Sequence, residues 1–124
     1  MKIQESAENY LEAILMLRER NGHVRSIDVA NELNFTKASV SVAMKRFRQE
    51  EYIIVNPDGN ITLTDKGMEI AQKIYERHKL IAKGLIALGV DEETAYEDSC
   101  RIEHDISDQS FDKLKEYLHS KGIE

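Results

Sequence analysis

The sequence predicts a mainly α-helical protein with two domains, and three observations support this fold class. Apolar residues recur at helical spacing through most of the 124 residues. A short segment, residues 52–63, alternates instead as two strands and a turn would. A link of only three residues, 34–36, joins two early helices. We predict one domain over residues 1–72 and a second, all-helical domain over residues 73–124, joined by a long helix rather than by a flexible linker.

Small hydroxyl residues mark where the early helices begin, because their side chains accept hydrogen bonds from helix N-termini. The expected N-caps are Ser6 for a helix to about residue 20, Ser26 for residues 27–33 and Thr36 for residues 37–49. The third of these helices would bury Val40, Ala43, Met44 and Phe47, at positions i, i+3, i+4 and i+7. Two helices joined by so short a turn, the second of them basic, indicate a helix-turn-helix.

The next segment adds a wing to this unit. Residues 52–55 and 61–63 are rich in β-branched and aromatic side chains, and residues 56–60 are typical of a turn. A hairpin directly after the basic helix predicts the winged form of the helix-turn-helix, in preference to a generic three-helix unit.

The C-terminal half is predicted to contain only helices. Their expected N-caps are Thr64 for a helix that continues to Leu88, Asp91 for a helix that carries Cys100 and His104, and Ser107 for residues 108–120. More apolar residues fall here than one thin layer can cover, which predicts a homodimer. The candidate dimerisation residues are Ile81, Leu85, Ile86, Leu88, Phe111 and Leu114, of which the sequence alone does not say which belong to the intradomain core.

The net charge of −6 is unevenly distributed along the chain. Between Thr36 and Gln49 the only ionisable residues are basic, whereas residues 91–124 hold eleven acids and four Lys or Arg residues. The basic helix is therefore suited to a polyanion such as DNA, and the acidic half is suited to cations. Alternatively, the charged residues of both regions only face solvent and bind no partner.

Cys100, Glu103 and His104 have the spacing i, i+3 and i+4, which places all three side chains on one face of a helix. A soft sulfur, a hard oxygen and a borderline nitrogen together suit a transition metal. An ordinary amphipathic helix with one buried Cys is the alternative. A single Cys rules out an intrachain disulfide, and neither a membrane-spanning run nor a signal peptide is present in the sequence, so we expect a cytoplasmic protein.

Several ordered motifs are spread over nearly the whole chain, at residues 6–14, 63–67, 77–78, 89–91 and 100–107. With these motifs the chain resembles the diphtheria-toxin-repressor family of metal-dependent transcriptional repressors. Within that family it is most similar to the shorter manganese transport regulators, which lack a C-terminal SH3-like domain.

The resemblance implies a metal site built from the first helix, the long helix and the Cys100 helix. The implied ligands are Asn9, Glu12, His78, Cys100, Glu103 and His104. Cys100 matches the iron-responsive members, whereas the manganese regulators have Glu there. Asn9 departs from the family, which has Met or Asp at this position, although an amide oxygen can still bind a metal. Ala82 and Tyr96 replace ancillary ligands, so the family's second site is not implied.

The resemblance further implies a repressor that uses Fe(II) or Mn(II) as corepressor, with Zn(II) or Co(II) able to bind in vitro, and that controls iron or manganese homeostasis. Its partners would be a double-stranded DNA operator and a second copy of the chain. Residues expected toward base edges are Thr36, Lys37, Ala38, Ser39 and Val42, and the resemblance points to Thr36, Ala38 and Val42 among them. Those expected to contact phosphates are Arg25, Lys37, Lys45, Arg46 and Arg48.

Two other functions fit parts of the same pattern. A winged-helix regulator could sense a thiol oxidant or a small molecule through Cys100, with the acidic residues incidental. A metalloenzyme could also use clustered Glu, His and Cys, but the sequence has no Gly-rich loop, nucleophile motif or extra acid/base pair beside the cluster, and the adjacent winged domain would be unexplained. We therefore expect a protein that is not an enzyme.

Overall fold

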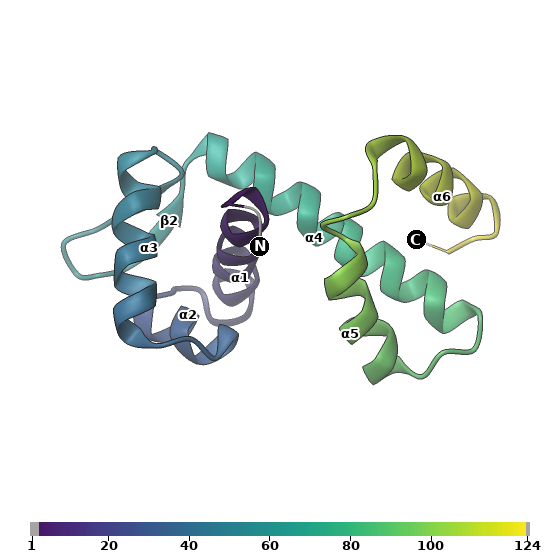
Figure 1. Ribbon diagram of the computed structural model, residues 1–124, viewed down its shortest axis with the longest axis horizontal. Helices are drawn as coiled ribbons and strands as arrows, with labels where there is room; N and C mark the ends of the chain where they lie inside the picture. Colours follow the sequence, from purple (N-terminus) through teal and green to yellow (C-terminus); the bar gives the residue numbers. More distant parts are fainter. Residues whose placement is uncertain (1–2, 124) are drawn as a thin grey trace. The chain divides into compact units, whose positions relative to one another are not determined.

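The structure is a computed structural model that describes residues 3–123 (Figure 1). Within those residues it contains six helices and a two-stranded sheet. Their bounds are α1 Ile3–Asn21, α2 Ser26–Leu33, α3 Lys37–Gln49, β1 Ile53–Val55, β2 Ile61–Leu63, α4 Asp65–Ala87, α5 Glu92–Ile102 and α6 Asp108–Ser120. The chain divides into two compact units, Met1–Gln72 and Lys73–Glu124, and the boundary between them falls inside α4. The mainly helical fold class predicted from the sequence is confirmed.

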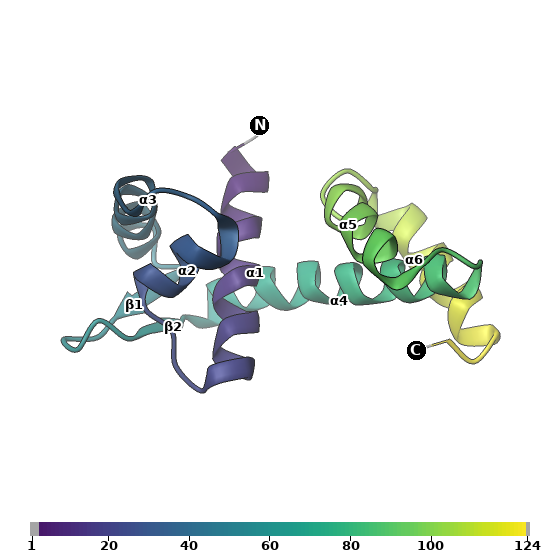
Figure 2. The same cartoon turned by 90° about the horizontal axis from the view of Figure 1, so that it is seen from below.

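The first unit is built around α1, which contacts α2 and β2, while α3 contacts α2 and β1. Leu11 and Ile14 of α1 are fully buried. The Tyr10 ring meets the Phe47 ring of α3 edge-on, with 5.4 Å between the centroids. Helix α3 therefore packs on α1 through one face, and its opposite face is exposed. The hairpin projects beyond the helices (Figure 2).

The turn between α2 and α3 has the predicted length and cap. Asn34 ends α2 in the left-handed conformation, with φ of 58°. Thr36 then caps α3, its hydroxyl oxygen accepting a hydrogen bond from the Ser39 N–H at 3.1 Å. The turn predicted from the three-residue link is therefore formed by a left-handed C-cap at Asn34 and a side-chain N-cap at Thr36, with Phe35 between them.

Two predicted N-caps are wrong. Ser6 lies inside α1, which already includes residues 3–5, so the helix starts before the serine. Ser26 is the first residue of α2 rather than its cap, and Arg25 is in the N-cap position. The Asp28 carboxylate accepts a hydrogen bond from the Arg25 N–H at 2.9 Å, so an acid from within the helix satisfies the backbone at this end.

The wing is a two-stranded antiparallel hairpin in which Ile53 pairs with Leu63 and Val55 with Ile61. Gly59 has φ of 88° in its turn, a conformation that favours glycine. A main-chain hydrogen bond joins the hairpin to the link between α1 and α2, because the Ile61 N–H donates to the Val24 carbonyl at 2.8 Å. The Arg18 guanidinium donates to the Ile61 carbonyl, also at 2.8 Å.

The second unit has its own apolar core of Leu80 and Ile81 from α4 and Phe111 and Leu118 from α6. The structure thereby divides the candidate dimerisation residues. Ile81 and Phe111 are buried in this core, and Leu85 and Leu114 pack partly against it. Ile86 and Leu88 are exposed, at 39% and 83% of their surface. Ile86 and Leu88 are thus the most exposed of the candidates, and the contact with a second copy of the chain stays a prediction.

Ser107 caps α6 as predicted, its side chain accepting a hydrogen bond from the Ser110 N–H at 3.1 Å. Replacing Ser107 by alanine removes this acceptor, and we expect the protein to lose about 1 kcal/mol of unfolding free energy. Urea unfolding at fixed protein concentration measures the change. Ser107→Thr keeps the hydroxyl and is expected to retain most of the stability; an equal loss in both variants would contradict the capping role.

Candidate metal centre and nucleic-acid interface

His78, Cys100 and Glu103 form a candidate metal-binding cluster, in which one potential ligand atom from each residue lies within 4.8 Å of the others. His78 comes from the middle of α4, Cys100 from the last turn of α5, and Glu103 from the C-cap position of α5. The His78 Nδ1 atom lies 2.9 Å from the Glu103 carboxylate and 3.6 Å from the Cys100 sulfur. The cluster therefore brings His78 next to Cys100 and Glu103, which lie 22 and 25 positions later in the sequence.

Burial differs among the three ligands. His78 and Glu103 are buried, whereas Cys100 is exposed. The main-chain carbonyl of His78 accepts a hydrogen bond from the buried Ser99 hydroxyl, and the His78 ring lies 5.5 Å from the Tyr96 ring, centroid to centroid. Packing from α5 thus fixes the orientation of the imidazole, while the sulfur remains open to solvent, where a cation can enter.

The spacing and chemistry of the cluster fit a divalent transition metal. Two ligand atoms each about 2.1 Å from an ion and at right angles lie about 3.0 Å apart. The separation of 2.9 Å between His78 Nδ1 and the Glu103 oxygen matches such neighbouring ligands. Imidazole nitrogen, thiolate sulfur and carboxylate oxygen together suit iron, cobalt or zinc, and the nitrogen and oxygen suit manganese.

His104 lies beside this cluster but not on the predicted helix face. Helix α5 ends at Ile102, two residues before His104, so the expected i+4 relation to Cys100 does not continue along the helix. The His104 Nε2 atom instead lies 3.4 Å from the second carboxylate oxygen of Glu103, and its side chain is only 3% exposed. His104 is therefore placed to support Glu103, and its role as a ligand stays a prediction.

The two remaining predicted ligands, Asn9 and Glu12, belong to α1 in the other unit. Glu12 is buried, at 7% exposure, and Asn9 is half-buried. Their assignment as metal ligands remains a prediction.

Helix α3 presents the residues predicted to read DNA on its exposed face. Thr36, Lys37, Ala38 and Ser39 are exposed around its N-terminus, and Val42 is 70% exposed one turn later. The Thr36 hydroxyl is already engaged, because it also donates to the Ser39 hydroxyl oxygen at 2.9 Å. What Thr36 can offer a base edge is therefore chiefly its methyl group, alongside the apolar side chains of Ala38 and Val42.

The basic residues predicted to contact phosphates differ in availability. Lys37, Lys45, Arg48 and Arg25 are exposed. Arg46 is half-buried and paired with Glu50 at 2.9 Å, and its guanidinium lies 5.9 Å from the centre of the Phe47 ring. Arg46 is thus engaged within the protein, and the other four are better placed for phosphates.

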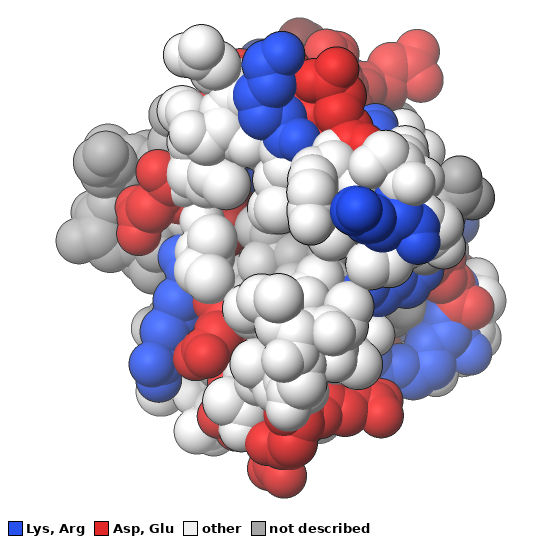
Figure 3. Space-filling model, turned by 90° about the vertical axis from the view of Figure 1, so that its right-hand side faces the viewer, with Lys and Arg blue, Asp and Glu red and all other residues white. Residues whose placement is uncertain are grey.

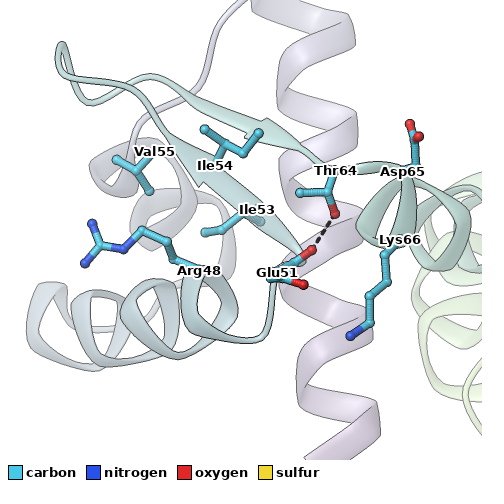
Figure 4. Close-up of a pocket in the computed structure, with 8 residues that line it drawn as sticks. All are labelled: Arg48, Glu51, Ile53, Ile54, Val55, Thr64, Asp65 and Lys66. Atoms are coloured by element: carbon cyan, nitrogen blue, oxygen red, sulfur yellow. Dashed lines mark hydrogen bonds between the residues drawn. The ribbon is translucent and has the colours of Figure 1, made fainter.

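An open pocket lies where the end of α3, the hairpin and the start of α4 meet (Figure 4). Ile53, Ile54 and Val55 form its apolar middle, with Arg48 at one end and Lys66 at the other. Lys66 is exposed and was not among the predicted interface residues, because in the sequence it stands only as part of a helix start.

Another residue without a predicted role is Arg77, which directly precedes His78. Arg77 is buried, at 6% exposure, and its guanidinium donates to the main-chain carbonyl of Glu103 at 3.2 Å. The only sequence feature that points to Arg77 is its position at the edge of the apolar stripe of α4, next to a predicted metal ligand.

The second unit carries charges of both signs at its surface. Figure 3 shows Lys and Arg side chains interspersed with Asp and Glu around an area of uncharged side chains on the face it presents. The acidic excess of residues 91–124 is partly balanced by basic residues of α4, as in the pair Lys73–Asp108 at 3.1 Å. Within the described part of the chain, we find no helix with the length and apolar character needed to cross a membrane.

Comparisons with known families cover almost the entire chain. Residues 2–61 match the family described as "Iron dependent repressor, N-terminal DNA binding domain". Residues 64–121 match "Iron dependent repressor, metal binding and dimerisation domain". The metal-binding cluster lies within the second match, and α3 lies within the first.

Individual relatives agree with this assignment. The chain is 37% identical over 118 residues to an uncharacterised HTH-type transcriptional regulator of Methanocaldococcus jannaschii, covering 94% of each chain. It is 37% identical over 109 residues to the HTH-type transcriptional regulator MntR of Bacillus subtilis, covering 88% of this chain and 77% of that protein.

Solved structures show the same fold in larger proteins. The manganese regulator SloR superposes with a TM-score of 0.79 and 26% identity over 91% of this chain. The structure titled "Crystal Structure of ScaR with bound Zn2+" gives a TM-score of 0.74 and 27% identity, also over 91% of this chain. The chain spans 53% of the length of each of these two structures, which is about half.

Two family matches that together span residues 2–121, and relatives at 37% identity over most of their length, settle the classification. The chain belongs to the iron-dependent repressor family, the family of the diphtheria toxin repressor and MntR, whose members are metal-dependent transcriptional repressors with a DNA-binding domain and a metal-binding and dimerisation domain.

Proposed function

We propose that His78, Cys100 and Glu103 hold the divalent metal that acts as corepressor, with His104 beside them and Asn9 and Glu12 as further predicted ligands. The observation that carries the proposal is the approach of three different ligand types to within 4.8 Å of one another. A bound cation supplies positive charge next to the buried Glu103 carboxylate, which favours the ordered arrangement of α4 and α5. The domain assignment follows: residues 1–72 bind DNA, and residues 73–124 bind the metal and dimerise.

The proposed physiological metal is Fe(II) or Mn(II), and the regulated process is iron or manganese homeostasis. Support comes from the family description and from relatives named as manganese regulators. Affinity for sites with nitrogen, oxygen and sulfur ligands rises from Mn(II) through Fe(II) to Co(II), and Zn(II) also binds such sites tightly. Zn(II) and Co(II) are therefore expected to bind in vitro.

We further propose that the repressor acts as a homodimer in the cytoplasm and is not an enzyme. The family's dimerisation domain and the exposed Ile86 and Leu88 support a second copy at this unit. Two copies would present two α3 helices to successive half-sites of an operator. Metal and operator binding are then linked, so that each raises the affinity for the other.

Chelation tests the proposed function. A fluorescent duplex selected from a random-sequence pool by the Mn(II)-loaded protein is titrated in Mn(II), Fe(II), Zn(II) or EDTA at fixed salt. We expect EDTA to weaken DNA binding at least about tenfold. Equal affinity with and without metal would contradict the proposal.

The Cys100→Ser variant separates the alternatives. Loss of metal-dependent DNA binding supports the metal corepressor, whereas loss of only a peroxide response supports an oxidant sensor. Turnover of a substrate by the metal-loaded protein would indicate an enzyme.

A further prediction concerns the charge of α3. Lys45 is exposed on the helix proposed to enter the groove, and a phosphate contact releases about one counterion. We expect Lys45→Met to lower the slope of log affinity against log salt by about 1. The matched control is Lys113→Met on α6, whose lysine pairs with Glu116 at the surface. The same change in slope for both variants would argue against a contact by Lys45.

A further inference from the structure

Arg77 is a buried cation next to the metal-binding cluster, and its contacts all go to the segment that follows α5. Its guanidinium donates to the Glu103 carbonyl at 3.2 Å and to the Ile106 carbonyl at 2.8 Å. It also pairs with the Asp108 carboxylate at the start of α6. One side chain of α4 thus holds both ends of the link between α5 and α6.

The geometry of these contacts requires an arginine. Two carbonyls and a carboxylate are reached by different N–H groups of one planar fork, whereas a lysine offers its three donors from a single nitrogen. The guanidinium also lies over the Phe111 ring, 5.3 Å from its centre, a contact that favours a planar cation. The Arg77 side chain is 7% exposed, and its hydrogen bond to the Glu103 carbonyl is buried, whereas its partner Asp108 is 69% exposed.

The segment that Arg77 holds carries Glu103 and His104. Beyond the end of α5, main-chain hydrogen bonds from Asp105 and Ile106 to the Ile102 carbonyl, at 3.0 and 3.1 Å, form a single turn. A single turn is weak without support from tertiary contacts. The Glu103 main chain is held on two sides, because its N–H donates to the Ser99 carbonyl at 3.0 Å and its carbonyl accepts the hydrogen bond from Arg77.

We propose that Arg77 is a positioning residue of the metal centre, which keeps Glu103 and His104 in place for a divalent cation by holding the main chain from Glu103 to Asp108. This inference rests on the proposed function, because it takes His78, Cys100 and Glu103 as the metal ligands. Arg77 does not bind the metal. It keeps the turn ordered before the metal binds, and this lowers the free-energy cost of metal binding.

Lys73 provides a matched control. It also pairs with Asp108, at 3.1 Å, and its hydrogen bond holds the pKa of that carboxyl below its ordinary value. Its side chain is 58% exposed, and the structure records no hydrogen bond from it to the carbonyls of Glu103 or Ile106 among residues 3–123. Lys73→Met therefore removes one cation from Asp108 and leaves the Arg77 contacts intact.

The test measures Co(II) affinity of the full chain by titration of the thiolate-to-metal absorption band, together with thermal unfolding and amide hydrogen exchange of the apo protein. Arg77→Lys is expected to bind Co(II) at least about tenfold more weakly, the range found when a group behind a metal ligand is lost. The amides of Asp105 and Ile106 are expected to exchange faster in the apo variant. Lys73→Met is expected to stay within about twofold of the parent protein, as is usual for surface pairs.

Co(II) affinity of Arg77→Lys within about twofold of the parent, or an equal loss in Lys73→Met, would overturn the proposal. Should Arg77→Lys not fold, Asp108→Asn takes its place, because it weakens the exposed anchor of the guanidinium; it also weakens the pair with Lys73, which Lys73→Met removes on its own. This variant is expected to bind Co(II) more weakly than Lys73→Met, and equal affinities would overturn the proposal.

His78→Ala distinguishes this failure from failure of the metal site itself. If His78→Ala binds Co(II) as tightly as the parent, the proposed ligands are wrong and the role of Arg77 falls with them. If His78→Ala loses Co(II) while Arg77→Lys keeps it, the site stands and only the positioning role is rejected.

Discussion

Replacing Glu103 by glutamine is expected to weaken metal binding by at least about 100-fold and to abolish metal-dependent DNA binding. Loss of a group behind a ligand already costs about 10- to 100-fold, and Glu103 is itself a proposed ligand. Glutamine has the same shape but no charge, so an amide oxygen replaces a carboxylate at the centre of the cluster. Because Glu103 is fully buried, solvent offers no substitute for the lost charge.

The same variant separates metal affinity from folding. The glutamine oxygen can still accept a hydrogen bond from the His78 ring, which lies 2.9 Å from the present carboxylate, so the apo protein is expected to stay folded. Isothermal titration with Mn(II) and Co(II), and anisotropy of the selected duplex, measure the two effects. The control is Glu97→Gln, the same substitution on the exposed face of α5. Metal affinity close to that of the parent in Glu103→Gln would remove Glu103 from the site.

Replacing Gly67 by alanine is expected to destabilise the first unit by about 3 kcal/mol or more. A Cβ atom at this position would lie 2.1 Å from the Tyr52 carbonyl oxygen, which is main chain and cannot rotate away. That carbonyl is also held in place, since it accepts hydrogen bonds from the main-chain N–H and the hydroxyl of Thr64, both at 3.1 Å. Alanine would gain up to about 1 kcal/mol in helix propensity, which is too little to offset the overlap.

Urea unfolding at fixed protein concentration measures this loss. Gly84→Ala is the matched control, because it is the same substitution in the same helix. Its added Cβ would meet a side-chain methyl of Leu118 at 3.1 Å rather than a carbonyl. A methyl group can shift by a few tenths of an ångström, so we expect Gly84→Ala to change stability by no more than about 1 kcal/mol. A Gly67→Ala protein as stable as the parent would show that the hairpin and α4 can separate freely.

How well the fold could be predicted depended on where the helix caps come from. The bounds of α3 and α6 agree with the prediction, because Thr36 and Ser107 cap through their own side chains and the sequence shows them directly. At α2 the acid that satisfies the backbone is Asp28, inside the helix, so the preceding serine was misleading. The helical periodicity identified the apolar faces but not the elements that cover them. Only the structure shows that Ile81 is buried in the core, whereas Ile86 is exposed.

The residues of the metal-binding cluster could likewise be predicted only in part from the sequence. Local spacing could place Cys100 next to Glu103, but His78 lies 22 residues earlier than Cys100 and came only from the family resemblance. The position of His104 was mistaken in part, because a helix periodicity gives no sign that the hydrogen bonds stop at Ile102. Arg77 could not be assigned from the sequence, since its partners are main-chain carbonyls, which every residue possesses.

The boundary between the two units falls between Gln72 and Lys73, in the interior of α4. Two fragments divided at this boundary would each have a cut helix end. The N-terminal fragment would have four carbonyls without N–H partners, and the C-terminal fragment would have four N–H groups without acceptors. The N-terminal fragment would be better extended to Ala87, where the helix ends naturally. The C-terminal fragment would begin better at Asp65, so that the two expression products share the whole helix.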